Sequence, residues 1–194
     1  PLPAPRQEAQ GARGIEFEST ARAGEGEEYA IFTLRDRYLA VAAERVLEAA
    51  ESRDLNRFGA SNGQIVGVVP FVDMNGETSY VPVLSLHDFF DLPRDEVRGQ
   101  IVVTECRHGK LGLLVDELHQ VVEFDRAEVK PIPEVMSSRF RWIHRLISGN
   151  GGAQMVTAIA PEAVYEMLRD RIKGHLDAVG PGGPGTPIRL QPAA

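Results

Sequence analysis

Residues 109–122, GKLGLLVDELHQVV, carry the strongest structural signal of the chain. The run Leu111–Val115 is apolar except for one glycine, and the turn residues 108–110 separate it from the β-branched run Ile101–Val103. Two such runs joined by a short glycine-containing turn predict a β-hairpin. An acidic pair then leads into residues 118–124, whose valines and phenylalanine predict a further strand.

Other hairpins are predicted on both sides of this stretch. Strands with turn residues between them recur about every ten residues, which is typical of a β-barrel or a β-sandwich. Long helices alternating with strands, the mark of a parallel α/β fold, are missing. The predicted hairpins pair 29–34 with 38–41, and 65–72 with 79–84 across the Asn-Gly turn 73–76. A fourth hairpin is expected to run from residue 142 to residue 156 around the glycine-rich turn 149–152.

Two helical segments are predicted, and a third stretch is ambiguous. Pro161 suits the first position of a helix, and apolar residues then recur at helical spacing. A single turn within 84–90 would be capped by Ser85. Residues 42–51 are rich in Ala and Glu, which favours helix, whereas their place between strands favours extended chain. The apolar positions of the C-terminal helix are Val164, Met167, Leu168 and Ile172.

Composition divides the chain into a folded centre and two flanks. Proline and glycine dominate residues 1–27, which also hold few large apolar residues, so we expect a flexible leader or linker. Residues 174–194 are similar, and we expect a flexible Gly/Pro-rich tail. The folded domain is therefore expected over residues 28–173.

Charge and cysteine content argue against several classes of protein. The net charge of -7 gives no global basic field for nucleic acid and no polybasic membrane patch, although a local patch stays possible. Cys106 is the only cysteine, so an internal disulfide and a multi-cysteine zinc site are both excluded. No apolar run approaches the roughly 18 residues that span a bilayer. A cytoplasmic protein without direct membrane insertion is expected.

A search for catalytic or metal-binding motifs finds little. The five histidines form no metal-ligating pair, so we expect no metal and no cofactor. Cys106 lies two residues from His108, which would share a face of an extended strand, so a cysteine-dependent enzyme remains a remote alternative. Arg139, Arg141 and Arg145 form a local basic cluster, and we expect them to face solvent while Phe140 and Trp142 face inward.

The motifs resemble those of the CheW-like domain family, to which the bacterial chemotaxis coupling proteins belong. Residues 109–122 are similar to the family's glycine turn, GLLVDEV motif and following strand. Residues 100–105 match the strand before it and Pro131-Ile132-Pro133 the proline pair after it. Residues 28–34, 38–48 and 67–86 resemble the earlier blocks in the same order, so that the resemblance spans about residues 28–170.

The resemblance implies a fold and a role. The fold would be mainly β, with two small five-stranded SH3-like barrels packed about a pseudo-twofold axis and a C-terminal helix. The role would be that of a non-catalytic scaffold in bacterial chemosensory signalling. Its partners would be the regulatory domain of the chemotaxis histidine kinase and the cytoplasmic tip of a chemoreceptor. The chain would then lie at membrane-associated chemoreceptor arrays.

The resemblance also indicates partner-binding residues and a departure. Val46, Leu47 and Glu48 match the V-x-E ending at which the family places contacts of the first barrel. Asn75 stands where the family usually carries an arginine tied to partner binding, and an amide cannot replace a guanidinium. An alternative function therefore stays open. The chain would then be a docking domain of a larger array-associated regulator that does not activate the kinase.

Overall fold

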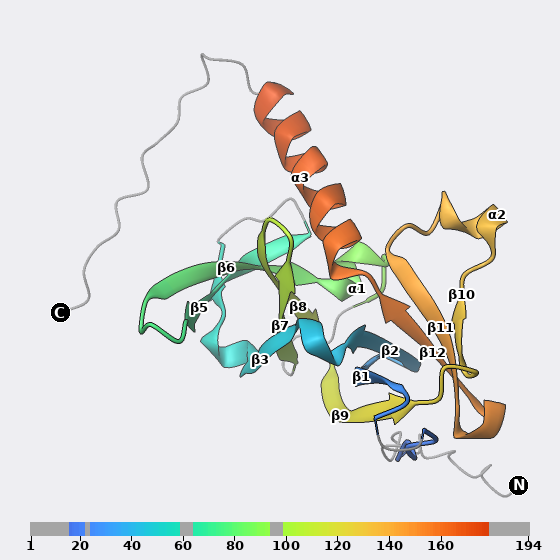
Figure 1. Cartoon of the computed structure of the whole chain (residues 1–194). Helices are drawn as coiled ribbons and strands as arrows, with labels where there is room; N and C mark the ends of the chain where they lie inside the picture. Colours follow the sequence, from blue (N-terminus) through green and yellow to red (C-terminus); the bar gives the residue numbers. More distant parts are fainter. Residues whose placement is uncertain (1–15, 22–23, 59–63, 94–98, 179–194) are drawn as a thin grey trace, which may run out of the picture.

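The computed structural model describes residues 16–21, 24–58, 64–93 and 99–178, with side chains up to Arg169. These residues form two curled antiparallel-rich sheets of six strands each, and α3 projects from them (Figure 1). The predicted mainly-β class is confirmed. The elements are β1 (Glu27–Leu34), β2 (Arg37–Ala42), η1 (Ala43–Arg45), β3 (Val46–Glu51), η2 (Ser52–Asp54), β4 (Asn56–Arg57), β5 (Ile65–Val72), β6 (Thr78–Ser85), α1 (Leu86–Phe89), β7 (Gln100–Cys106), β8 (Gly109–Val115), β9 (Glu117–Phe124), β10 (Val129–Pro131), α2 (Glu134–Ser137), β11 (Ile143–Gly149), η3 (Asn150–Gly152), β12 (Gln154–Ile159) and α3 (Pro161–Ala178).

The two sheets repeat one topology. Sheet A has the order β10-β11-β12-β2-β1-β9 and sheet B the order β3-β7-β8-β6-β5-β4. In each sheet two antiparallel hairpins meet at one parallel pair, β2 with β12 in sheet A and β6 with β8 in sheet B. This repeat agrees with the two SH3-like barrels implied by the resemblance. The resemblance implied five strands in each barrel, whereas each sheet here has six strands, counting the short edge strands β4 and β10.

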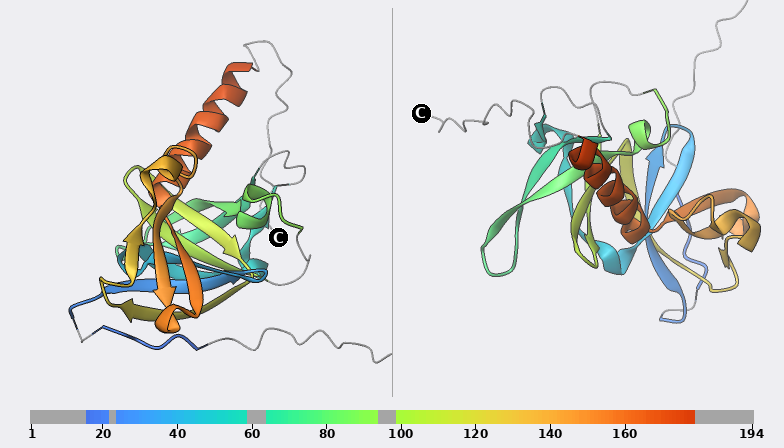
Figure 2. Two further views of the ribbon diagram at one scale, coloured as in Figure 1. Left: turned by 90° about the vertical axis from the view of Figure 1, so that its right-hand side faces the viewer. Right: turned by 90° about the horizontal axis from the view of Figure 1, so that it is seen from above.

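Sheet B is continuous in sequence, whereas sheet A is assembled from both ends of the chain. Sheet B runs from Val46 to Val115, and sheet A takes β1 and β2 before it and β9 to β12 after it. The two further views show the sheets side by side with α3 rising from their junction (Figure 2). Closing sheet A therefore requires pairing between β1 and β9 and between β2 and β12, both of which are distant in sequence.

All four hairpins predicted from the sequence are present, and the ambiguous stretch is extended. Residues 43–45 form one 3-10 turn, and residues 46–51 then form β3, which pairs with β7. Ala and Glu favour helix by only tenths of a kcal/mol per residue, which the ladder of hydrogen bonds to β7 outweighs. The short turn at α1 also has its predicted cap, since the Ser85 hydroxyl accepts a hydrogen bond from Asp88 N at 3.2 Å.

Three groups of buried side chains hold the molecule together. One fills sheet A around Tyr29, Ile31 and Phe124, and another fills sheet B around Val69 and Ile101. The third lies between the sheets and is made by both of them and by α3. This central core contains Phe32, Leu34, Leu39, Val41, Leu84, Leu86, Val102, Cys106, Leu111, Leu113, Val115, Ile159, Val164 and Leu168.

The C-terminal helix begins as predicted and extends further than predicted. Pro161 is its first residue, and Val164 and Leu168 are buried in the central core. The helix continues to Ala178, past Gly174, where the composition placed the start of the tail. Glycine lowers helix stability by only about 1 kcal/mol relative to alanine, which a helix already anchored by its first two turns tolerates.

The expected leader also differs from the structure. Residues 16–21, which the sequence assigned to it, pack along β9, and Phe17 is buried in the core of sheet A. The Phe17 ring makes edge contacts with Tyr38 and Phe124, at centroid distances of 5.0 Å and 6.4 Å. A single aromatic residue in a polar stretch leaves no periodic pattern, so its burial could not be predicted from hydrophobic spacing. Residues 1–15 lie outside the described residues.

Candidate partner-binding surfaces

The predicted contact residues Val46, Leu47 and Glu48 open the edge strand β3. Of the described strands, only β7 pairs with it, and the register shifts between Val46 and Glu48, so Leu47 is the extra residue of a β-bulge. Leu47 is 37% exposed, Glu48 is half-buried, and Val46 packs against the central core. An edge strand offers unpaired backbone groups to a partner. Of the three predicted side chains, Leu47 is the one presented to solvent.

Asn75 lies at the tip of the β5–β6 hairpin, away from β3 in the strand order. The Asp73 carboxylate accepts hydrogen bonds from Asn75 N and Glu77 N, both at 2.9 Å, and this fixes the turn. Asn75 and its neighbour Met74 are both exposed. Two strands, β7 and β8, separate β3 from this hairpin in sheet B, and no contact joins Asn75 to Leu47 among the described residues.

The outer face of the hairpin is an apolar surface that sequence reasoning missed. The inner face places Val69, Phe71, Val81 and Val83 in the core of sheet B. On the opposite face Val72 and Tyr80 are 58% and 67% exposed. On this face the register places Val68 opposite Pro82 and Pro70 opposite Tyr80. We call this surface the hairpin face; it consists of Val68, Pro70, Val72, Tyr80 and Pro82.

A signal for the hairpin face was present in the sequence. Residues 65–72, IVGVVPFV, are apolar at every position, so both faces of the strand are apolar. A strand with one face in water normally alternates apolar and polar residues, and a continuous apolar run indicates that both faces are covered. Among the described residues, Pro70, Val72 and Tyr80 of the outer face are exposed, whereas Val68 and Pro82 are half-buried.

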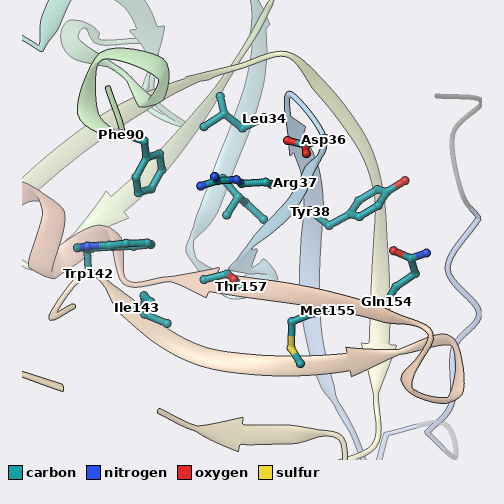
Figure 3. A pocket seen from close by; sticks show the side chains of 11 residues that line it. Leu34, Asp36, Arg37, Tyr38, Phe90, Trp142, Ile143, Gln154, Met155 and Thr157 are labelled. Atoms are coloured by element: carbon teal, nitrogen blue, oxygen red, sulfur yellow. The ribbon is translucent and has the colours of Figure 1, made fainter. Parts of the chain in front are cut away.

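A groove of about 270 Å³ opens between the β1–β2 turn, the end of α1 and the β11–β12 hairpin (Figure 3). Phe90 and Trp142 form one end of it, and Tyr38 and Gln154 lie at the other. Met155, which is 61% exposed, lies along its floor with Thr157. The groove thus combines elements of sheet A with the end of α1, the short helix between β6 and β7 of sheet B.

The aromatic end of the groove is a cluster of four rings. Phe90 and Trp142 are 4.7 Å apart between ring centroids, and Phe89 lies 5.0 Å from Phe90. Phe140 adds a further edge contact with Trp142 at 6.1 Å. Phe140 and Trp142 are half-buried while Arg139 and Arg141 are exposed, so the predicted directions are confirmed for these four residues, although their segment is a loop rather than a strand. Arg145, which was also expected to face solvent, is half-buried in β11. Partly buried aromatic rings are frequent anchors of protein interfaces.

Two charged residues of the β1–β2 turn border the groove. Figure 3 shows the guanidinium of Arg37 pointing toward the aromatic end, with Asp36 above it. Both side chains are exposed, and no hydrogen bond or ion pair engages Arg37 among the described residues. The groove is therefore apolar at its base and charged at its rim, as protein-binding surfaces usually are.

Asp116, from the motif that opened the sequence argument, connects the β1–β2 turn to α1. Its carboxylate accepts a hydrogen bond from Arg35 N at 2.6 Å and lies 3.0 Å from Nε2 of His87. Asp116 N donates to Thr33 O at 3.1 Å. Arg35 has a φ of 60°, an unusual conformation for a residue with a side chain, and the bond to Asp116 stabilises it. His87 is buried, and neither ring nitrogen has a well-aligned hydrogen-bond partner among the described residues.

Cys106 has the opposite of the environment that a nucleophile needs. Burial, with a smaller contribution from the nearby Glu162 carboxylate, raises the pKa of its thiol to about 11. A reactive cysteine needs a lowered pKa and access to solvent. His108 is exposed and makes no contact with Cys106 among the described residues. Within the described ranges, no three His, Cys, Asp or Glu side chains are grouped so as to hold a metal ion.

The comparison with protein-family models finds one family for this chain. The family model of the CheW-like domain matches residues 28–169. The chain belongs to the CheW-like domain family. This match covers most of the chain and both sheets, and it supports a scaffold or adaptor role in chemotaxis.

A solved structure gives the same fold. The crystal structure of the scaffolding protein TtCheW from Thermoanaerobacter tengcongensis superposes with a TM-score of 0.58 at 19% sequence identity. The superposition covers 70% of this chain and 89% of that chain. No curated protein sequence matches the chain. Among the described residues, no helix has the length and apolar character needed to cross a membrane.

Proposed function

We propose that this chain is a non-catalytic adaptor of a bacterial chemosensory array, binding the regulatory domain of the histidine kinase and the cytoplasmic tip of a chemoreceptor. Membership of the CheW-like family supports the class of protein. The hairpin face carries the proposal, because a soluble chain rarely exposes contiguous apolar side chains without a partner.

The hairpin face suits the kinase regulatory domain, which shares the barrel fold of this family. Two flat β-surfaces bury a large area when the outward side chains of paired strands interdigitate. The hairpin face presents aromatic, proline and valine side chains on two paired strands, with Met74 exposed at the tip. The bulged edge strand β3 is a further proposed contact, through Val46, Leu47 and Glu48. Asn75 at the hairpin tip is another.

The groove is the proposed site for the receptor tip, which would dock there as a helix. A helix docks by inserting apolar side chains into a groove while charged side chains pair at the rim. The aromatic end of the groove with Trp142 would receive the apolar side chain, and Arg37 would pair with a carboxylate. The proposed location is at receptor arrays, in the cytoplasm.

Titration calorimetry of the full chain with a cognate kinase regulatory domain tests the first contact. We expect micromolar affinity, equivalent to about -8 kcal/mol. Tyr80→Asp places a charge on the hairpin face and should weaken binding at least tenfold. Val135→Asp is the matched control, because Val135 is 88% exposed on α2, outside the proposed surfaces. Equal affinity for wild type and Tyr80→Asp would contradict the proposal for this face.

Leu47→Asp tests β3 with both partners. Val46→Asp is a poorer probe, because Val46 packs against the central core and a buried charge would unfold the chain. Loss of binding to either partner with an unchanged melting temperature would support β3 as a contact. Unchanged affinity for both partners would remove Leu47 from the proposed site.

Asn75 favours a second candidate function, that of a docking domain in a larger regulator. The hairpin tip is exposed and carries no guanidinium, so the arginine contact usual in the family is missing. A domain of this kind would localise to arrays without restoring chemotaxis in a coupling-protein deletion strain. Full restoration would instead support the adaptor. Asn75→Arg should strengthen kinase binding if the missing guanidinium is the reason for a weak contact.

A further inference from the structure

Residues 16–21, here called the strap, lie along the outer edge of β9 as a docked peptide rather than as a strand. β9 pairs with β1 on its inner edge, and within the described part of the chain no strand pairs with its other edge. One backbone hydrogen bond, from Thr20 N to Glu123 O at 3.3 Å, joins the strap to that free edge. The Ser19 hydroxyl donates to the same carbonyl at 3.0 Å.

Side-chain amides of sheet A hold the strap backbone on both sides of Phe17. The Asn150 amide donates to Glu16 O and accepts from Glu18 N, both at 3.3 Å. The Gln120 amide donates to Phe17 O at 2.6 Å. Hydrogen bonds of this kind recognise an extended backbone whatever its side chains are, as in peptide-binding sites.

The Phe17 side chain fills a slot shaped for one aromatic ring. Its walls are the rings of Tyr38 and Phe124 and the backbone of Gly149. A Cβ atom at Gly149 would lie only 3.0 Å from the Phe17 ring, so the absence of a side chain there makes room for the ring. Phe17 is 3% exposed, whereas Glu16, Glu18, Ser19 and Thr20 are all exposed. Phe17 is therefore the one buried side chain of the strap, while the Thr20 hydroxyl bonds to Glu128 and accepts from Asp125 N at 3.2 Å.

A turn around Glu123 connects the strap to β1. The Glu123 carboxylate accepts hydrogen bonds from Gly24 N at 3.0 Å and Gly26 N at 2.9 Å. Gly24 has a φ of 81°, which folds the chain back so that the strap and β1 lie on opposite edges of β9. Extending the backbone at Gly24 would carry the strap away from its own sheet.

We propose that the slot is a peptide-docking site, which the strap fills within one chain and which the strap of a second copy of this chain fills when two copies exchange straps. The second copy is the occupant because its strap makes every contact that is seen within one chain. The exchange needs another backbone conformation at Gly24, and exchange of an identical element is a low-cost route to a dimer. The proposal is independent of the proposed adaptor function, since it involves neither the hairpin face nor the groove.

The first test uses a pair of glycines with matched conformations. Gly24 and Gly76 have φ values of 81° and 79°, and a Cβ added to either meets no atom within 4 Å. Alanine therefore imposes the same backbone penalty at both sites, but only at Gly24 does it disfavour the closed turn. Light scattering on a size-exclusion column, over a concentration series, should show a monomer–dimer equilibrium for the wild type. Gly24→Ala should raise the association constant at least threefold, and Gly76→Ala should leave it unchanged.

The second test removes the anchor and supplies it in trans. Phe17→Ala should abolish the dimer and leave the slot empty. A fluorescent peptide with the sequence of residues 16–21 should then bind the Phe17→Ala chain at least tenfold more tightly than the wild type, whose slot is filled. The same peptide with alanine in place of phenylalanine should not bind.

Two results would overturn the proposal. One is a monomer at every concentration for both the wild type and Gly24→Ala. The other is a Phe17→Ala chain that folds but binds no peptide, which would make the strap a permanent part of sheet A. The comparison of Gly24→Ala with Gly76→Ala stands even if Phe17→Ala fails to fold, because neither glycine contacts the core. Unchanged binding of the kinase regulatory domain by Gly24→Ala would separate this result from that of the adaptor proposal.

Discussion

Asp116 connects three parts of the chain that are distant in sequence. It follows β8, accepts a hydrogen bond from the β1–β2 turn at Arg35, and lies beside the buried His87 of α1. In the sequence this acidic residue stands directly after an apolar strand, and the pattern gives no sign of its partners. Its actual contacts come from β1 and α1, which the local pattern around residue 116 does not contain.

Asp116→Ala should lower the free energy of unfolding by about 1–3 kcal/mol, because the Arg35 amide loses its acceptor. Asp116→Asn keeps a carbonyl oxygen and should cost less than the alanine variant. Urea denaturation followed by circular dichroism measures both values. Equal stability of all three chains would show that water replaces the carboxylate at this partly exposed site.

Cys106 gives a prediction about pH. The thiolate is the form that reacts, and burial raises the pKa of this thiol to about 11. The native chain should therefore react slowly with a disulfide reagent at pH 8, and its rate should rise about tenfold per pH unit up to the pKa. Unfolding in urea should accelerate the reaction at least 100-fold at pH 8. Fast reaction of the native thiol at that pH would restore the cysteine-dependent enzyme as a hypothesis.

At the scale of elements, Gly112 in β8 shows which part of a strand depends on residues distant in sequence. Gly112 is buried in β8 between β7 and β6, where an added Cβ would lie 3.0 Å from both Ile101 and Val83. The glycine thus permits close packing across the parallel junction of sheet B. A run of apolar residues predicts the strand, but the need for glycine at one position arises from neighbours that are 11 and 29 residues away.

Gly112→Ala should destabilise the chain by about 1–3 kcal/mol through overpacking. Ala49→Val is a suitable control, since it adds two methyl groups to an exposed position of the edge strand β3. Thermal unfolding of the two variants should differ clearly in midpoint. A Gly112→Ala chain as stable as the control would mean that the junction relaxes to accept a methyl group.

The hairpins, the α1 cap and the start of α3 could be predicted from sequence because each depends on residues that are close together. Asn-Gly turns, Ser85 before α1 and Pro161 before α3 are local signals. The groove and the slot for Phe17 could not be predicted, because their walls come from segments about 100 residues apart in sequence. The hairpin face could be predicted in part. The apolar run 65–72 is visible in the sequence, but the sequence does not show which of its two faces is exposed.

At the scale of the whole molecule, the central core decides whether the two sheets behave as one unit. Its members come from β1, β2, β6, β7, β8, β12 and the helices α1 and α3, so neither sheet can lose its structure without exposing part of it. Sheet A also contains the two chain segments that enclose sheet B in sequence. We therefore expect one cooperative unfolding transition, in which a destabilising substitution in sheet B also lowers the unfolding midpoint of sheet A.

Trp142 makes this expectation measurable, because it is the only tryptophan and lies in the groove bordered by sheet A. Ile101→Ala opens a cavity in the core of sheet B and should cost about 2–5 kcal/mol. If the sheets unfold together, the urea midpoint reported by Trp142 fluorescence falls by the same amount as the midpoint reported by circular dichroism. A Trp142 midpoint that stays at the wild-type value would show that sheet A unfolds independently, and that the central core joins the sheets without coupling their stability.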